Sequence, residues 1–366
     1  MLPKDFYENV PSRCVKECGL NADDIFISIA IPTYKRTDLL EQAINSALNQ
    51  DVTGGGGVKY EIVVVSNDPS ADLSHFIEKY KNFDNISFYV NAENLGLAGN
   101  MNRGAMLAHG KFVSYLHDDD LLKPNYIQEI SKILLDEKYN DALCILNSFE
   151  FIQFDGTEIK YENTELKQGA LKIFAKTFVR KILEAFINLA FKFHNFKFDR
   201  KDIIEITPEI ALHILPGNIY MAPSCGTVFN REKFFEAGGW SEEGEMSYDL
   251  YSFLRFNEQF KIYRIKEALG IYRNGVNISS QRSTRINFCR NDFALLDRKC
   301  KDEKSNQIKK YLRLRFMPHD ERDEVYRILN LKPYTPSFLE LLLYRIKNYW
   351  FIKSHNLDYL LNIKGI

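Results

Sequence analysis

The sequence lacks a run of about 18 apolar residues, the length that an α-helix needs to cross a bilayer. We therefore expect no membrane-spanning helix. The first residues, 1–14, lack the apolar core of a secretory signal peptide, so we expect a cytoplasmic protein. The six cysteines are scattered and form no CxxC pair, which is typical of reduced thiols and disfavours a zinc site.

A large net charge is also absent. The chain holds 48 Lys and Arg against 49 Asp and Glu, so no overall field attracts nucleic acid, and we expect no nucleic-acid partner. The charges are nevertheless segregated. Residues 166–201 carry about +7 and residues 290–366 about +6, which leaves about −14 on the rest of the chain.

Four glycines, residues 54–57, are not followed by the Lys-Ser/Thr pair of a phosphate-binding P-loop. This absence disfavours a P-loop nucleotide site, and the segment is expected to be a loop between two elements.

Apolar runs that are typical of buried strands alternate with helical patterns four times within about 120 residues. This order favours an α/β fold: a doubly wound, mostly parallel sheet flanked by helices. A helical insertion and a helical C-terminal region follow. The expected strands are residues 25–32, 60–68, 86–91, 111–120 and 142–152.

Polar clusters stand where three of these strands end: residues 33–36, 66–68 and 118–120. Ligands of doubly wound sheets bind outside the carboxyl ends of the strands. We therefore expect the three clusters to converge on one crevice.

The third cluster contains three consecutive aspartates, Asp118, Asp119 and Asp120, whose carboxylates repel one another. A divalent cation, Mn²⁺ or Mg²⁺, bound through carboxylate oxygens would remove this repulsion. The alternative is a solvated turn in which Asp120 caps the next helix.

As a set, these segments resemble the nucleotide-binding half of the family 2 glycosyltransferases, which have the GT-A fold. The resemblance covers about residues 27–124, including the Asp-rich (DXD) metal motif of the family. It rests on PTYKR (32–36), VSND (65–68), NLG (94–96), NRG (102–104) and LHDDD (116–120).

The resemblance implies that Asp119 is the main metal ligand, with Asp120 beside it. Tyr34 would stack on the base or pack at a helix start. Either Asn67 or Asp68 would accept the hydrogen bond of the base's imide. The residues expected to contact the nucleotide are Pro32, Thr33, Tyr34, Arg36, Asn67, Asp68, Asn94, Gly96, Asn102 and, near the ribose, Asp118.

The chain departs from the family pattern at three places. Met101 stands where relatives often have an arginine near the phosphates, and Ser66 and Asn67 replace an acidic pair. His117 replaces an acid before the aspartates. It is either a hydrogen-bond donor behind them or a partly buried polar residue.

Residues 215–256 resemble the second signature of the family, in which a Glu-Asp pair precedes an arginine by six residues. Asp249 then corresponds to the general base, with helix capping or one of the nearby residues Glu242, Glu243 and Glu245 as alternatives. On the acceptor side, Trp240 either lines the pocket or fills the core. Tyr248 is a further expected acceptor contact, and Arg273 reaches the diphosphate or makes a structural ion pair.

Residues 160–205 form a predicted basic amphipathic insertion with an apolar face, and residues 337–361 mix Trp, Tyr and basic residues. Each segment either packs inside the protein or lies on an anionic membrane surface. The second alternative places the protein peripherally on the inner face of the cell membrane.

The predicted organisation is a lead-in (1–24), a catalytic domain (25–283) with halves 25–155 and 206–283, and a helical region (284–366).

The resemblance implies an inverting, metal-dependent transfer of sugar from a nucleotide diphosphate-sugar, which we expect to be a UDP-sugar. The acceptor would be a hydroxyl on a glycan or lipid-linked glycan of a bacterial surface polysaccharide. The alternatives are a non-catalytic nucleotide-sugar-binding protein and a nucleotidyltransferase. The PTYKR turn disfavours the latter, which would carry a glycine-rich basic loop there.

Overall fold

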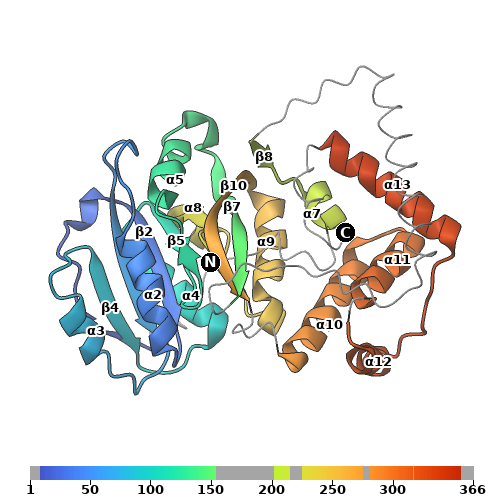
Figure 1. Ribbon diagram of the computed structural model, residues 1–366, viewed down its shortest axis with the longest axis horizontal. Coiled ribbons are helices and arrows are strands. Elements are labelled where there is room, and N and C mark those ends of the chain that lie inside the picture. Colours follow the sequence, from blue (N-terminus) through green and yellow to red (C-terminus); the bar gives the residue numbers. More distant parts are fainter. Residues whose placement is uncertain (1–8, 154–201, 215–224, 275–280, 316, 356–366) are drawn as a thin grey trace.

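The computed structural model describes residues 9–153, 202–214, 225–274, 281–315 and 317–355. Its strands form one ten-stranded sheet in the order β1-β4-β3-β2-β5-β9-β7-β10-β6, with β8 paired to β10 (Figure 1). The strands are β1 (Ser12–Lys16), β2 (Ile25–Thr33), β3 (Lys59–Ser66), β4 (Ile86–Asn91), β5 (Phe112–Tyr115), β6 (Leu121–Leu122), β7 (Ala142–Gln153), β8 (Ile203–Glu205), β9 (Val228–Asn230) and β10 (Lys261–Asn274).

Helices cover both faces of the sheet and continue beyond it (Figure 1). They are α2 (Thr37–Leu48), α3 (Ser74–Lys79), α4 (Gly96–Leu107), α5 (Tyr126–Leu134), α7 (Pro208–Ile214), α8 (Arg231–Glu236), α9 (Tyr248–Gln259), α10 (Arg282–Lys299), α11 (Glu303–Leu314), α12 (His319–Ile328) and α13 (Phe338–Ser354). Short 3₁₀ helices lie at Ala22–Asp24, Glu137–Tyr139 and Glu245–Ser247.

The strands β4, β3, β2 and β5 are parallel neighbours, and β7 and β10 are parallel to each other. The strands β1, β6, β8 and β9 join antiparallel. This confirms the predicted doubly wound, mostly parallel sheet with flanking helices and a helical C-terminal region. Because parallel strands end at the same edge, the segments after β2, β3 and β5 come close together.

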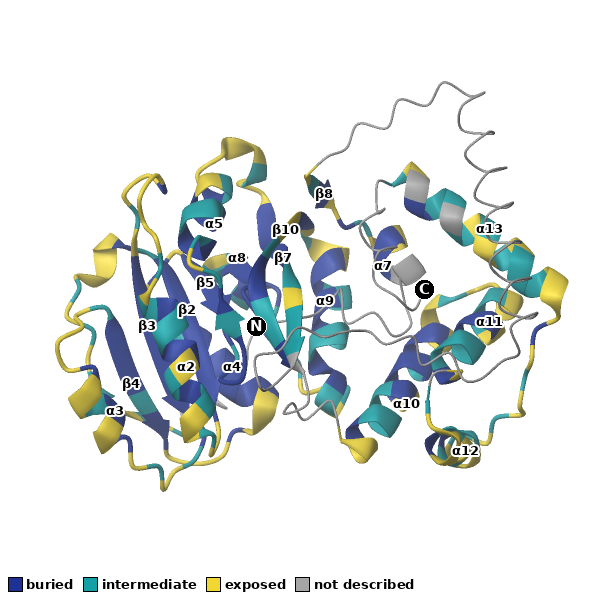
Figure 2. Cartoon of the chain, viewed as in Figure 1, coloured by how far each residue is buried: buried dark blue, intermediate teal, exposed yellow. Residues whose placement is uncertain are grey.

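Strand β2 is buried on both faces, as strands of parallel sheets are. Ile27, Ile29 and Ile31 belong to a core with α2, α3 and α5, whereas Ala30 belongs to the core with α4, α8 and α9. Figure 2 shows the buried strands between helices whose outer faces are exposed. A continuous β-branched run therefore becomes the central layer that holds the strand ends in place.

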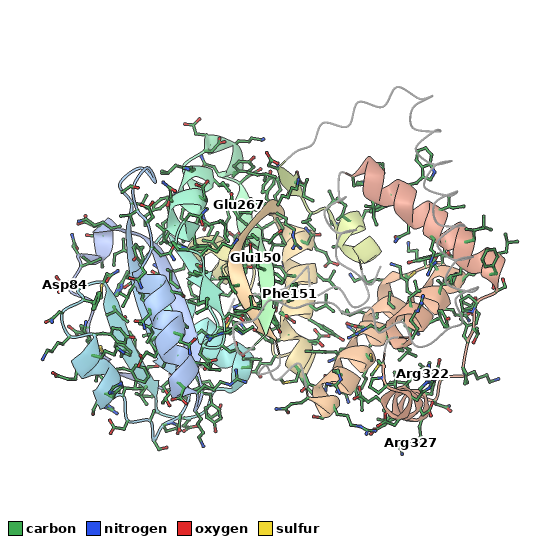
Figure 3. The ribbon with its side chains drawn as sticks, in the orientation of Figure 1. Asp84, Glu150, Phe151, Glu267, Arg322 and Arg327 are labelled. Carbon is green, nitrogen blue, oxygen red and sulfur yellow. The ribbon has the colours of Figure 1, made fainter. Side chains whose placement is uncertain are left out.

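The C-terminal helices α10, α11 and α12 bury a small core of their own around Phe293 and Leu296. Ile352 of α13 belongs instead to the second core of the sheet domain, so the helical region is tied to that domain. In Figure 3, Asp84 beside β4 and Arg322 and Arg327 on α12 lie at opposite sides of the molecule.

The structure contains a strand that the sequence did not predict. Strand β1 pairs with β4 inside the predicted lead-in, and as a short edge strand of mixed exposure it has no clear two-residue period. Most of the predicted basic insertion, residues 160–201, lies outside the described residues. Among the described helices, none combines the length and the apolar character that crossing a bilayer requires.

Gly110 allows the loop before β5 to approach β2 closely. Its N–H donates to Ser28 Oγ at 2.8 Å, and a Cβ at this position would stand 2.7 Å from the backbone nitrogen of Ser28. We expect Gly110→Ala to lower the free energy of unfolding by about 1–3 kcal/mol, because the backbone must move. Urea unfolding, with the exposed neighbour Lys111→Ala as control, measures this. Equal midpoints for the two variants would contradict the close approach.

Candidate active site at the strand ends

The chain turns sharply after β2 and exposes a short polar segment. Lys35 has a φ of +58°, in the left-handed region that non-glycine residues rarely adopt. Tyr34 is 44% exposed, with the Lys35 ammonium 5.1 Å from its ring centre. Pro32 and Thr33 are buried. The turn therefore presents one aromatic face to solvent beside α2, where a planar base has room to stack.

Asp118 is buried and anchored to the end of β2. Thr33 Oγ1 donates a hydrogen bond of 2.7 Å to Asp118 Oδ2, and Arg36 Nη1 lies 3.6 Å from Oδ1. Burial raises the pKa of Asp118 to about 6, and the neighbouring charge of Asp119 adds to the rise, although the hydrogen bond from Thr33 opposes it. Two sequence-predicted segments, 33–36 and 118–120, are thus in direct contact.

Asp119 and Asp120 each accept a hydrogen bond from a different arginine residue. Arg36 Nη1 donates to Asp119 Oδ2 at 2.5 Å. The backbone N–H of Arg273 donates to Asp120 Oδ1 at 3.1 Å. Burial and the charge of Asp119 hold the pKa of Asp120 well above its usual range. Asp120 does not cap α5, whose start at Asn125 has no side-chain cap, so the capping alternative is wrong.

Arg273 brings the second half of the chain to the aspartates. It is buried; its Nε donates to the carbonyl oxygen of Asp119 at 2.5 Å, and its Nη1 donates to Gln42 Oε1 at 2.6 Å. Its Nη2 is buried and has no hydrogen-bond partner among the described residues. Gln42 could not be identified from the sequence, because a single polar residue on the face of α2 gives no signal.

One ligand atom each from His117, Asp119 and Asp120 lies within 4.8 Å of the others. Two buried carboxylates and an imidazole form a donor set that fits Mn²⁺, and the carboxylates alone fit Mg²⁺. Burial and, to a lesser extent, the charge of Asp119 raise the pKa of Asp118, although Arg36 lies beside it. The donors and the charge both fit a divalent cation.

Asn67 organises a second cluster after β3. Its Nδ2 donates to Asn94 Oδ1 at 2.7 Å and to the Gly96 carbonyl oxygen at 3.0 Å. Its Oδ1 accepts from Asn91 Nδ2 and from the Leu95 N–H. Since the Asn67 amide is used inside the protein, the neighbouring half-exposed carboxylate of Asp68 is better placed to receive an external donor; Asp68 accepts from Ser70 Oγ and its pKa is lowered by this bond.

Asn102 and Trp240 are joined inside the core. Asn102 Nδ2 donates to the Trp240 carbonyl oxygen at 2.9 Å, and the Trp240 N–H donates to Asn102 Oδ1 at 2.8 Å. Trp240 is buried and lies edge-to-face with Tyr115 and with Tyr248, at ring-centre distances of 5.6 and 5.4 Å. Of the two alternatives for Trp240, its position is that of a core residue. Met101, the position without the family's arginine, is buried in the same core.

Asp249 lies in the first turn of α9, next to the buried Tyr248, and is half-buried. Burial raises its pKa to about 7; the N–H of Leu250 donates to Oδ1 at 2.7 Å and opposes the rise. Glu243 and Glu245 make ion pairs with Arg298 and Arg290 of α10. Among the described residues, no hydrogen bond or ion pair joins Asp249 to the aspartate loop; the aromatic core around Trp240 connects them.

Residues 28–207 match the family described as "Glycosyl transferase family 2". This segment, about half of the chain, has the sequence pattern of glycosyl transferase family 2. The match contains the strand ends after β2, β3 and β5 and therefore all three polar clusters, which the sequence resemblance had also identified.

Two curated relatives and one solved structure illustrate the similarity. The "GalNAc(5)-diNAcBac-PP-undecaprenol beta-1,3-glucosyltransferase" of Campylobacter jejuni is 37% identical over 98 residues, 26% of this chain and 30% of that protein. The "Putative glycosyltransferase EpsH" of Bacillus subtilis is 30% identical over 112 residues, 30% of this chain and 31% of that protein. The chain thus spans about a third of the length of these relatives. The crystal structure of S. aureus TarS 1–349 covers 90% of both chains at 14% identity, with a TM-score of 0.47.

The raised pKa of Asp118 predicts how the stability of the metal-free protein depends on pH. Between about pH 4 and 6 the folded state holds a proton that the unfolded chain releases, so stability falls as pH rises through this window. We expect Asp118→Asn to be more stable than the wild type by about 2–3 kcal/mol at pH 8, and by much less at pH 4. Urea unfolding at both pH values measures this. A difference independent of pH, like that of the exposed control Glu93→Gln, would contradict the assignment.

Proposed function

We propose that this chain is a metal-dependent, inverting glycosyltransferase that moves a sugar from a UDP-sugar to a hydroxyl acceptor. The observation that carries the proposal is the contact of Thr33 and Arg36 with the buried aspartates Asp118 and Asp119 at the ends of two parallel strands. The match of residues 28–207 to the family supports the same class of reaction.

The nucleoside would lie along the ends of β2 and β3. The exposed ring of Tyr34 offers a stacking surface, and the carboxylate of Asp68 can accept the imide N–H of uracil. Asn67, Asn94 and Gly96 would shape this wall through their hydrogen bonds to one another. Asp118 would orient the ribose through Oδ1, the oxygen that does not accept the hydrogen bond of Thr33 and that lies 3.6 Å from Arg36.

Asp119 and Asp120 would hold the cation, Mn²⁺ or Mg²⁺. When bound, the cation supplies electrostatic stabilisation of the charge that develops on the leaving diphosphate. The guanidinium of Arg36 is about one-third exposed and can turn from Asp119 towards a phosphate oxygen. The buried Nη2 of Arg273 offers a second cationic donor next to the loop. Both arginines then replace the cationic contact that Met101 cannot provide.

Asp249 would accept the proton of the acceptor hydroxyl. A general base works best when its pKa lies near the working pH, and burial raises the pKa of Asp249 to about 7. The ion pairs of Glu243 and Glu245 with α10 make these two carboxylates weaker candidates. A single base without a carboxylate nucleophile is the arrangement of single displacement with inversion.

For the acceptor we propose a lipid-linked glycan of a bacterial surface polysaccharide. The Campylobacter jejuni relative is named for a GalNAc(5)-diNAcBac-PP-undecaprenol substrate, a glycan on a polyprenyl diphosphate, which supports this class. A screen of nucleotide sugars for thermal stabilisation and hydrolysis in the presence of Mn²⁺ tests the donor assignment directly.

We expect Asp249→Asn to lower the transfer rate by about 10²–10⁴-fold while UDP binding stays within about twofold, because the amide cannot accept the proton. In the wild type, kcat/KM should rise with pH up to about 7 and then level off, since only the ionised carboxylate is a base. Glu242→Gln is the matched control. Transfer that survives in Asp249→Asn would identify a different base, and transfer by neither protein would favour the non-catalytic binding alternative.

We further propose that α13 contacts an anionic membrane surface. Phe338, Leu339 and Leu343 are 70%, 62% and 57% exposed on this helix, and the basic residues Arg345 and Lys347 are exposed beside them. An exposed apolar group flanked by basic residues is the pattern of helices that bind at a bilayer interface.

The wild type should float with phosphatidylglycerol vesicles, and a variant with Ser at positions 338, 339 and 343 should stay in the bottom fraction. Loss of apolar area and unchanged charge explain the expected difference. Neutral phosphatidylcholine vesicles serve as the control. Equal flotation of the two proteins would reject α13 as the contact.

A further inference from the structure

His117 stands two residues after the end of β5 and is brought to the aspartates by a tight turn. The N–H of Asp120 donates to the His117 carbonyl oxygen at 3.1 Å. This turn groups the side chains of residues 117, 119 and 120, whose ligand atoms lie within 4.8 Å of one another. Asp118 lies between them in sequence but bonds to Thr33 instead. The backbone thus selects an imidazole and two carboxylates as one group.

We propose that His117 supplies a nitrogen ligand to the cation held by Asp119 and Asp120, and that this ligand makes the site favour Mn²⁺ over Mg²⁺. The inference rests on the proposed function, because it concerns the cation that the donor diphosphate would share. It assigns a role to the one residue of the HDDD segment that the family resemblance left without one.

The geometry suits a shared ion. Two ligands that each lie about 2.1 Å from one ion are at most about 4.2 Å apart. The observed grouping within 4.8 Å therefore needs only a small side-chain rotation to close around a cation. Asp119 and Asp120 are almost fully buried and His117 is half-buried, so the remaining ligand positions face the more open side.

The chemistry of the donors sets the preference. Mg²⁺ is a hard ion that takes oxygen ligands and keeps its waters, whereas imidazole nitrogen suits transition-metal ions. A histidine in the place of a carboxylate also removes one negative charge, which lowers the electrostatic attraction that Mg²⁺ depends on most. His117 should therefore weaken Mg²⁺ binding more than Mn²⁺ binding.

Arg36 is compatible with this assignment. Its guanidinium bonds to Asp119 Oδ2 and balances part of the charge of the loop. Because the side chain is about one-third exposed, it can leave the carboxylate when a cation enters.

Electron spin-echo spectroscopy of Mn²⁺ bound to the untagged full chain with UDP tests the proposal. The wild type should show nitrogen coupling that changes when histidine is labelled with ¹⁵N. His117→Gln should lose the coupling. His75→Gln, an exposed histidine on α3 beside Glu41, should keep it and serves as the matched control.

His117→Asp provides a second variant that restores an all-oxygen site. We expect its preference for Mn²⁺ over Mg²⁺, measured by competition, to fall at least about tenfold relative to the wild type. A wild-type spectrum without nitrogen coupling, coupling retained in His117→Gln, or an unchanged preference in His117→Asp would each overturn the proposal. Sugar transfer by a wild type without nitrogen coupling would leave the proposed function standing, whereas a wild type that neither transfers sugar nor binds UDP would contradict both.

Discussion

The crowding of Asp118, Asp119 and Asp120 at the end of one strand is the constraint on which the candidate site depends. Each of these carboxylates is buried, so neither water nor salt screens them well. The protein places polar partners around them: Thr33 and Arg36 contact Asp118, Arg36 also contacts Asp119, and the backbone of Arg273 contacts Asp120. Burial, together with the charge of Asp119, keeps the pKa values of Asp118 and Asp120 raised, and a bound divalent cation would offset the charge of these carboxylates.

The rest of the fold can be understood as support for this loop. Strand β2 is buried on both faces and fixes the turn that carries Thr33 and Arg36. Strand β10 brings Arg273 from the far part of the chain, where its segment pairs with β6 directly after the aspartates. The aromatic core of Tyr115, Trp240 and Tyr248 then links the end of β5 to the first turn of α9 and so to Asp249. Parts distant in sequence thus meet at one loop.

Sequence alone predicted the sheet and the convergence of its strand ends, because buried β-branched runs and the polar residues that follow them are local patterns. It did not predict which groups touch. Arg273 and Gln42 form a hydrogen bond although they are 231 residues apart in the chain. The Asn67 amide uses both its oxygen and its nitrogen in contacts with residues up to 29 positions away. Trp240 shows the same limit, since a lone aromatic after two glycines suits a pocket as well as a core.

The central claim is that a cation and a diphosphate complete the charge balance of the aspartate loop, and calorimetry of UDP binding tests it most directly. The wild type should bind UDP at least about tenfold more tightly with Mn²⁺ than without it, and Asp119→Asn should lose this gain because its amide is a weak ligand. UDP affinity that is independent of Mn²⁺ in the wild type, or the same Mn²⁺ gain in Asp119→Asn, would contradict the account.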